Sequence, residues 1–196
     1  MNALDLKEGN VFEYEGKLYI VKSSIHVVQQ QRRGIVKIKA TEIDTGRAVE
    51  FNFRSDTEVK NVILEEIPLT YLYSDGNLYY FMDNSNYEQF HLDSDTIGDK
   101  RYYLKENLEV VGLFYQGKII DIQLPFTVDL KVIEAEPGYK GDTVQGGRKK
   151  VKVETGLIVQ TPLFIEVGDI IRIDTRTGEY ITRVWNINKN LGKLNE

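Results

Sequence analysis

The chain of 196 residues contains no cysteine, two histidines and four prolines. Without cysteine it can form neither a disulfide framework nor a thiolate zinc site, and this absence favours a reducing compartment. The two histidines, His26 and His91, fall in different predicted units, so a histidine zinc cluster or a Ser-His-Asp arrangement has little support. We expect no metal site and no cofactor.

Long hydrophobic runs are also missing. No stretch approaches the roughly 20 apolar residues that a membrane helix needs, and the first eight residues carry acids where a secretory signal peptide needs cations. A content of 41% hydrophobic and 28% charged residues is typical of a globular protein. We therefore expect a cytoplasmic protein that has no membrane partner.

Positive charge is scarce, since 25 Lys and Arg face 30 Asp and Glu. A nucleic-acid-binding protein usually has a basic surface, so the net charge of -5 taken alone argues against a nucleic-acid partner. The distribution is uneven, because residues 22–54 carry seven cations against three acids, 137–153 five against one, and 65–109 three against ten. This pattern fits a protein that touches RNA at two separate places, and it equally fits ordinary variation of surface charge.

Short alternating runs fill the sequence, and their period of two predicts an all-β protein. Only residues 99–107 suggest a helical turn or two. Units of about 60 residues are individually marginal, so they are expected to pack on one another or to share short linkers. The predicted domains are 1–64, 65–128 and 129–185, followed by a flexible tail at 186–196. The predicted strands are 10–14, 17–21, 35–39, 48–53, 71–73, 78–82, 110–115, 118–124 and 128–133.

The segment 137–149 combines four glycines with three cations. Glycine lets the backbone approach a ligand closely, and cations attract phosphate. A nucleotide-binding P-loop is excluded, because Gly147 and Arg148 stand where that motif needs Lys and Ser or Thr. The predicted RNA-binding residues of this loop are Lys140, Gly141, Asp142, Thr143, Gly146, Gly147, Arg148 and Lys149.

Together with that loop, the runs Thr155–Asp169 and Asp174–Arg183 resemble the C-terminal domain of bacterial translation elongation factor P. The resemblance extends across residues 4–184, including Tyr71-Leu-Tyr73 and Gly16-Lys-Leu-Tyr19. It implies three small β-barrels, an SH3-like (KOW-like) barrel and then two oligonucleotide-binding (OB) barrels, in an elongated layout like transfer RNA. It also makes Tyr180 and Arg183 possible RNA contacts, although a packing role for Tyr180 is equally expected.

The tip loop of the first domain departs from this family. The family loop reads approximately His-Val-Lys-Pro-Gly-Lys-Gly, and its second lysine reaches toward the peptidyl-transferase centre and is often modified. Counting back without gaps from Lys37 puts Gln31 at that position, whereas a slip of one or two residues puts Arg32 or Arg33 there. The loop has no lysine, so lysine modification is not expected, and no modifying enzyme is identified. The predicted tip residues are Gln29, Gln30, Gln31, Arg32, Arg33 and Gly34.

The resemblance implies a translation elongation factor that is not an enzyme. It would act as a monomer, bind both ribosomal subunits beside peptidyl transfer RNA, and stimulate peptide-bond formation at poor substrates such as proline runs. The alternative is a paralogue that binds the ribosome or single-stranded RNA without a role at the peptidyl-transferase centre. A hydrolase is the least favoured class, because the paired acids Glu65 and Glu66 point to opposite faces of a strand.

Overall fold

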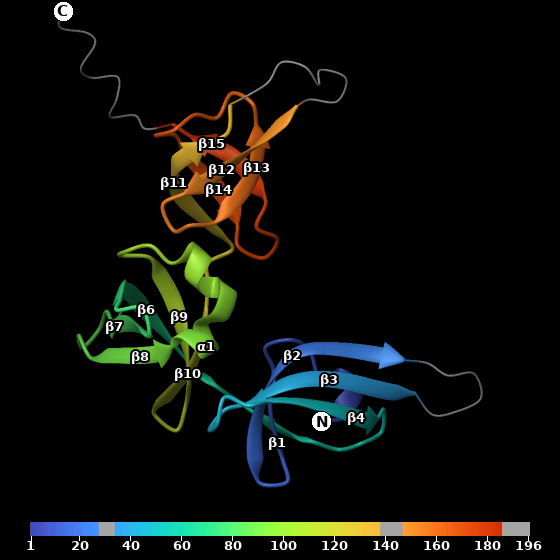
Figure 1. The fold of residues 1–196 in the computed structure, drawn as a ribbon. Coiled ribbons are helices and arrows are strands. Elements are labelled where there is room, and N and C mark those ends of the chain that lie inside the picture. Colours follow the sequence, from blue (N-terminus) through green and yellow to red (C-terminus); the bar gives the residue numbers. More distant parts are fainter. Residues whose placement is uncertain (28–33, 138–146, 186–196) are drawn as a thin grey trace, which may run out of the picture. The chain divides into compact units, whose positions relative to one another are not determined.

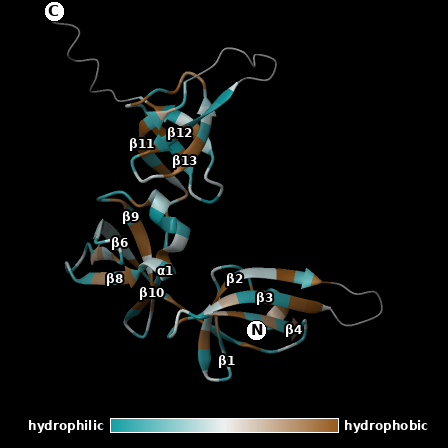
Figure 2. Cartoon of the chain, in the orientation of Figure 1, coloured by the Kyte–Doolittle hydropathy of each residue, from teal (hydrophilic) through white to brown (hydrophobic). Residues whose placement is uncertain are grey.

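A computed structural model describes residues 1–27, 34–137 and 147–185 of the chain. The described residues form an all-β protein with three sheets of five strands each, as Figure 1 shows. The predicted fold class is therefore confirmed. Figure 2 shows hydrophobic and hydrophilic residues mixed along the strands, as expected when one face of each sheet packs inward and the other meets water.

The first sheet has the strand order β4-β3-β2-β1-β5. Its first hairpin turns at Glu15 and Gly16, both with positive φ, as the sequence predicts for a two-residue turn. The core gathers buried aromatic and aliphatic side chains, among them Phe12 and Ile38, which are fully buried. The elements are η1 (Ala3–Asp5), β1 (Val11–Tyr14), β2 (Lys17–Val27), β3 (Ile35–Glu42), β4 (Ala48–Arg54) and β5 (Lys60–Val62).

The central sheet has the order β10-β9-β6-β7-β8. Helical structure begins at Ser94, five residues before the predicted helical segment, because the Asp93 carboxylate caps the helix by accepting a hydrogen bond from the Thr96 backbone N–H at 2.7 Å. The elements are β6 (Glu65–Ser74), β7 (Leu78–Asp83), β8 (Gln89–Asp93), α1 (Ser94–Ile97), η2 (Gly98–Tyr103), β9 (Glu109–Tyr115) and β10 (Lys118–Gln123).

The third sheet has the order β13-β12-β11-β14-β15, which repeats the connectivity of the central sheet when the strands of each are counted along the chain. Valine and isoleucine dominate its core, with Leu130, Ile171 and Ile173 fully buried. The strands are β11 (Thr127–Ala135), β12 (Arg148–Val153), β13 (Ile158–Pro162), β14 (Ile170–Asp174) and β15 (Tyr180–Val184).

The chain divides into two compact units. The first comprises residues 1–66 and 113–120, and the second comprises residues 67–112 and the chain from 121 onward. Within the second unit the Thr155 hydroxyl donates to the Tyr102 carbonyl, and Lys105 Nζ donates to the Asp129 carbonyl at 2.6 Å. These bonds connect the central helical segment to the third sheet.

Among the helices that the structure describes, none is long and apolar enough to span a bilayer.

Candidate RNA-binding surface

Strand β12 alternates between an outer and an inner face, and Lys149 is the one charged residue of the strand on the inner side. Val151 and Val153 are buried in the third sheet, at 1% and 0% exposure. Arg148 and Lys150, which precede Val151 in the strand, are exposed. Because successive strand residues point to opposite faces, Arg148, Lys150 and Lys152 share the outer face. The strand therefore presents three cations in a row to solvent.

The neighbouring strand β13 supplies the rest of this face. Its register places Pro162 opposite Arg148, Gln160 opposite Lys150 and Ile158 opposite Lys152. Directly opposed residues in an antiparallel pair lie on the same face. The amide of Gln160 can hydrogen-bond to a base edge or a ribose hydroxyl, and the cations beside it can bind phosphate. We call this set, Arg148, Lys150, Lys152, Ile158, Gln160 and Pro162, the β12–β13 surface.

A hollow of about 500 Å³ lies along the β13 side of the β12–β13 surface. It is shared between that surface and the turn that leads into β15. The predicted contact Tyr180 lines the hollow next to Arg148, and the tyrosine ring also packs against the core of the third sheet. The lining residues are Arg148, Ile158, Gln160, Pro162, Gly178, Glu179 and Tyr180.

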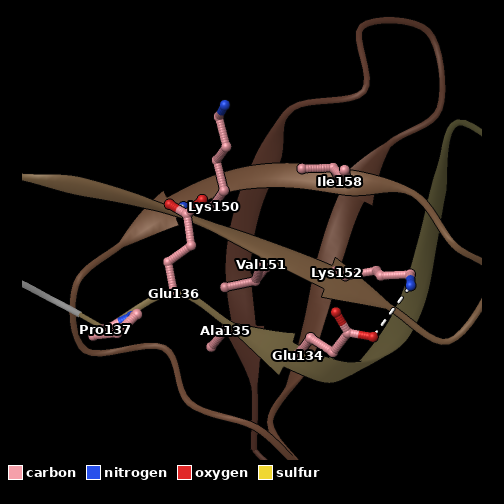
Figure 3. Close-up of a pocket in the computed structure, with 8 residues that line it drawn as sticks. All are labelled: Glu134, Ala135, Glu136, Pro137, Lys150, Val151, Lys152 and Ile158. Carbon is pink, nitrogen blue, oxygen red and sulfur yellow. Dashed lines mark hydrogen bonds and ion pairs between the residues drawn. The ribbon is translucent and has the colours of Figure 1, made fainter.

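A second hollow of about 500 Å³ lies beside Lys150 and Lys152 (Figure 3). Lys152 Nζ forms an exposed ion pair with Glu134 Oε1 at 3.1 Å, and the Lys150 backbone N–H donates to Glu136 Oε2 at 3.3 Å. Figure 3 shows the Lys150 side chain pointing away from the strand, and it has no ion-pair partner among the described residues. Lys150 therefore offers its charge to a ligand more readily than Lys152 does.

The predicted glycine-rich loop joins this surface only in part. Gly147 precedes β12, and Arg148 and Lys149 open the strand. At the other end of the loop, the Glu136 backbone N–H donates to the Lys150 carbonyl at 3.0 Å, so the loop leaves and re-enters the sheet at this surface. The remaining predicted residues lie outside the described part of the chain: Lys140, Gly141, Asp142, Thr143 and Gly146.

Arg183, the other predicted contact in this domain, lies in a different setting. Its guanidinium lies over the rings of Trp185 at 4.1 Å and Phe164 at 5.3 Å from the ring centres. Arg183 Nη1 also pairs with Asp169 Oδ2 at 3.5 Å. These contacts hold Arg183 among its own neighbours, so the structure does not place it in the hollow that Tyr180 lines.

A turn at the end of β14 positions Tyr180. The side chain of Arg176 donates to the Asp174 carboxylate through Nε at 3.0 Å and Nη2 at 2.6 Å, and the Arg176 backbone N–H adds a third bond at 2.9 Å. These bonds lower the pKa of Asp174 from 3.8 to about 2. The backbone closes the same turn, because Gly178 N–H donates to the Asp174 carbonyl at 2.8 Å.

The tip of the first sheet is described only at its base. Gln29, Gln30, Gln31, Arg32 and Arg33 lie outside the described residues, whereas Gly34 follows them directly. The Gly34 carbonyl accepts a hydrogen bond from Ser55 N–H at 2.9 Å, and a Cβ at Gly34 would overlap the His26 imidazole. Lys37 is exposed on β3 near this base, and its side chain lies on the solvent face of the strand.

Sequence reasoning missed Lys150, Lys152 and Gln160. The predicted site was defined by its glycines and therefore ended at Lys149. The alternation Arg148-x-Lys150-x-Lys152 was the available signal, because a period of two places all three cations on one strand face. Gln160 could be assigned only from the register between β12 and β13.

The arrangement can bind anions and bases. In the described ranges no cluster of three or more His, Asp or Glu residues is arranged to hold a metal ion. The β12–β13 surface presents guanidinium and ammonium groups, one amide and small apolar areas, with a phenol nearby. Such groups recognise phosphate, ribose and exposed bases.

Three family models together match nearly all of the chain. Residues 2–59 match the Elongation factor P (EF-P) KOW-like domain, residues 64–122 match the Elongation factor P (EF-P) OB domain, and residues 128–183 match Elongation factor P, C-terminal.

Curated relatives agree with these matches. Elongation factor P of Coprothermobacter proteolyticus is 45% identical over 180 residues, which cover 92% of this chain and 97% of that protein. Elongation factor P of Thermotoga maritima is 46% identical over 179 residues, which cover 91% of this chain and 97% of that protein. A solved structure of eukaryotic translation initiation factor 5A from Methanococcus jannaschii aligns with a TM-score of 0.40 at 19% identity, covering 62% of this chain and 94% of that one.

Proposed function

This chain belongs to the family of bacterial elongation factor P, a translation elongation factor, and we propose that it binds the ribosome beside peptidyl transfer RNA and stimulates peptide-bond formation at poor substrates such as proline runs. It acts in the cytoplasm as a monomer, contacts both ribosomal subunits, and has no active centre of its own. The chemistry of bond formation belongs to the ribosome.

The observation that carries this proposal is the β12–β13 surface. Three cations follow one strand of an OB-type sheet, beside an amide and a tyrosine-lined hollow, in a chain whose net charge is -5. The strand 2–3 face of OB barrels is where they bind oligonucleotides. A local basic surface on an acidic protein supports binding to RNA at defined places, because the acidic segments, such as residues 65–109, repel phosphate.

The proposed mechanism is positioning. Proline is a secondary amine whose ring fixes φ, so its approach to the reacting ester is restricted. A factor that braces the end of peptidyl transfer RNA reduces the entropic part of the barrier, and each 1.36 kcal/mol gained is about a tenfold increase in rate. In this proposal the tip residues 29–34 meet the acceptor end, and the β12–β13 surface holds RNA elsewhere on the ribosome.

The tip is tested by replacing Arg32 and Arg33 together with alanine and measuring the synthesis rate of a proline-run reporter. We expect a clear slowing of that reporter and an unchanged rate for a reporter without proline runs. The matched control is Arg47→Ala, because Arg47 lies in the turn at the opposite end of β3. A reporter rate equal to that of the control variant would refute the assignment of the tip.

The absence of a lysine in the tip favours one second candidate. According to this second candidate function, the chain is a paralogue that binds the ribosome or single-stranded RNA and has no role at the peptidyl-transferase centre. Ribosome co-sedimentation without rescue of proline-run synthesis would support this candidate, and co-sedimentation together with rescue would support the first. An intact mass of protein purified from its natural host shows whether any tip residue is modified.

A further inference from the structure

The outer face of the central sheet carries a row of three aromatic rings. Tyr73 on β6 pairs with Tyr80 on β7, and Tyr80 pairs with His91 on β8. The rings of Tyr73 and Tyr80 are stacked, with centroids 4.7 Å apart at 25°, and the rings of Tyr80 and His91 lie 6.1 Å apart at 46°. We call these three residues the aromatic row.

The aromatic row faces solvent. Tyr73 is 50% exposed, His91 is exposed, and Tyr80 is half-buried between them. The core of this sheet lies on the opposite face, where Phe81 and Leu92 are buried. The row therefore does not hold the sheet together from inside. A contiguous exposed aromatic surface commonly marks an interaction site.

The charge around this row has one sign. Residues 61–99 contain eight Asp or Glu and no Lys or Arg. The Asp75 carboxylate accepts hydrogen bonds from the backbone N–H groups of Leu78 and Asn77, and these bonds hold the pKa of Asp75 below its usual range. It also accepts a hydrogen bond from the Tyr80 hydroxyl at 3.1 Å. Asp93 stands opposite Leu78 at the next pair along the same face. Ionised carboxylates therefore border the exposed rings.

Comparison with the third sheet identifies what this face can bind. The two sheets have the same strand connectivity, so β7 and β8 correspond to β12 and β13. The corresponding outer face of β12 carries Arg148, Lys150 and Lys152, whereas that of β7 carries Leu78, Tyr80 and Met82. One fold thus presents the same face twice, basic in the third sheet and uncharged but bordered by the carboxylates of Asp75 and Asp93 in the central one, and these carboxylates would repel the phosphate of an RNA strand.

We propose that the aromatic row and its bordering carboxylates bind an arginine- or lysine-rich segment of a protein. A guanidinium lies flat on the exposed ring of Tyr73, where the ring quadrupole attracts a cation. Neighbouring cations of the same segment pair with Asp75 and Asp93. Stacking and charge act together here, and they give a function to an OB-type face that has exposed rings and no Lys or Arg within residues 61–99.

The test measures binding of the full chain to three fluorescent probes by anisotropy: an arginine-rich peptide, a glutamate-rich peptide of equal length, and a single-stranded RNA. We expect the arginine-rich peptide to bind and the glutamate-rich peptide not to bind at the central face. Tyr73→Ala should weaken the arginine-rich peptide about fivefold to tenfold, and Tyr73→Phe should stay within about twofold of the parent, because the ring is what a cation contacts.

Two further variants separate the aromatic row from general surface effects. Gln89→Lys places a cation on the outer face of β8 without removing an observed contact, and should weaken the arginine-rich peptide by repulsion. Tyr87→Ala is the matched control, because Tyr87 is 73% exposed in the turn before β8 and lies outside the row. This control should bind as the parent does.

The outcomes are distinct. Equal affinity of Tyr73→Ala, Gln89→Lys and Tyr87→Ala for the arginine-rich peptide would overturn the proposal. Binding of the RNA probe that Tyr73→Ala weakens and Arg148→Ala does not would also overturn it, since the central face would then be a base-stacking platform. If Tyr73→Ala unfolds by circular dichroism, Tyr73→Phe and Gln89→Lys still decide the question.

Discussion

At the scale of single residues, Asp174 shows how one carboxylate organises a site that it does not enter. Its three hydrogen bonds from Arg176 fix the turn before β15, and that turn presents Tyr180 to the hollow beside Arg148. The family resemblance singled out the Asp-Thr-Arg-Thr-Gly-Glu-Tyr run, and the structure gives it a physical role. Its first and third residues form the brace, and its last residue lines the hollow.

This brace predicts a pH dependence of stability. In the folded protein the pKa of Asp174 is about 2, below its ordinary value of 3.8. The hydrogen bonds between Arg176 and the ionised Asp174 therefore stabilise the fold fully above about pH 4, and this stabilisation is lost as the pH falls toward 2. Asp174→Asn should therefore lower the melting temperature at pH 7, with the difference from the parent shrinking between pH 4 and pH 2. Melting curves across this range check it, with Glu166→Gln, an exposed acid of the same domain, as the control. A difference that stays constant with pH would contradict the assignment.

At the scale of elements, β12 separates stability from binding by face. Val151→Ala should lower the free energy of unfolding by about 2 kcal/mol, because it removes buried methyl groups and leaves a cavity. Lys150→Ala should change that free energy by no more than about 0.5 kcal/mol, because its side chain lies on the solvent face. Urea denaturation measures both. Equal losses in the two variants would mean that the register of β12 is wrong.

The same scale shows what the sequence could predict. Hairpins with clear turn residues were predicted well, as at Glu15 and Gly16, because the turn fixes the register of both strands. Strand β8 was missed, because Leu92 is its only buried residue and the rest reads as polar loop. The predicted helical turn started too late, because the capping role of Asp93 was not recognised.

For the candidate site, the sequence located the basic region but did not predict which of its side chains share a face. Arg148 and Lys149 were named from the glycine-rich loop, but the shared face of Arg148, Lys150 and Gln160 depends on pairing between strands that a single sequence does not specify. The tip predictions for Gln29 to Arg33 stay predictions, because these residues lie outside the described part of the chain.

At the scale of the whole molecule, the cations of the third sheet and the aromatic rings of the central sheet, which carboxylates border, lie on corresponding faces. RNA affinity should therefore depend on salt despite the net charge of -5, because binding at β12 releases counterions from the RNA. Replacing Arg148 and Lys150 with alanine should reduce the slope of log affinity against log salt by about 1.4 for single-stranded RNA. Titrations at several salt concentrations measure this slope. Tyr73→Ala should leave it unchanged, and an unchanged slope in the double variant would remove β12 from the RNA contact.

The pairing of β5 with β1 has a practical consequence for anyone who excises the first domain. The family match ends at residue 59, whereas β5 occupies Lys60–Val62 and pairs with β1 through Val62 and Val11. A fragment cut at the family boundary would expose the backbone hydrogen-bonding groups along one side of β1. Such an open edge recruits strands from other molecules. Precipitation of that fragment would then reflect where the chain was cut and would say nothing against the independence of the domain.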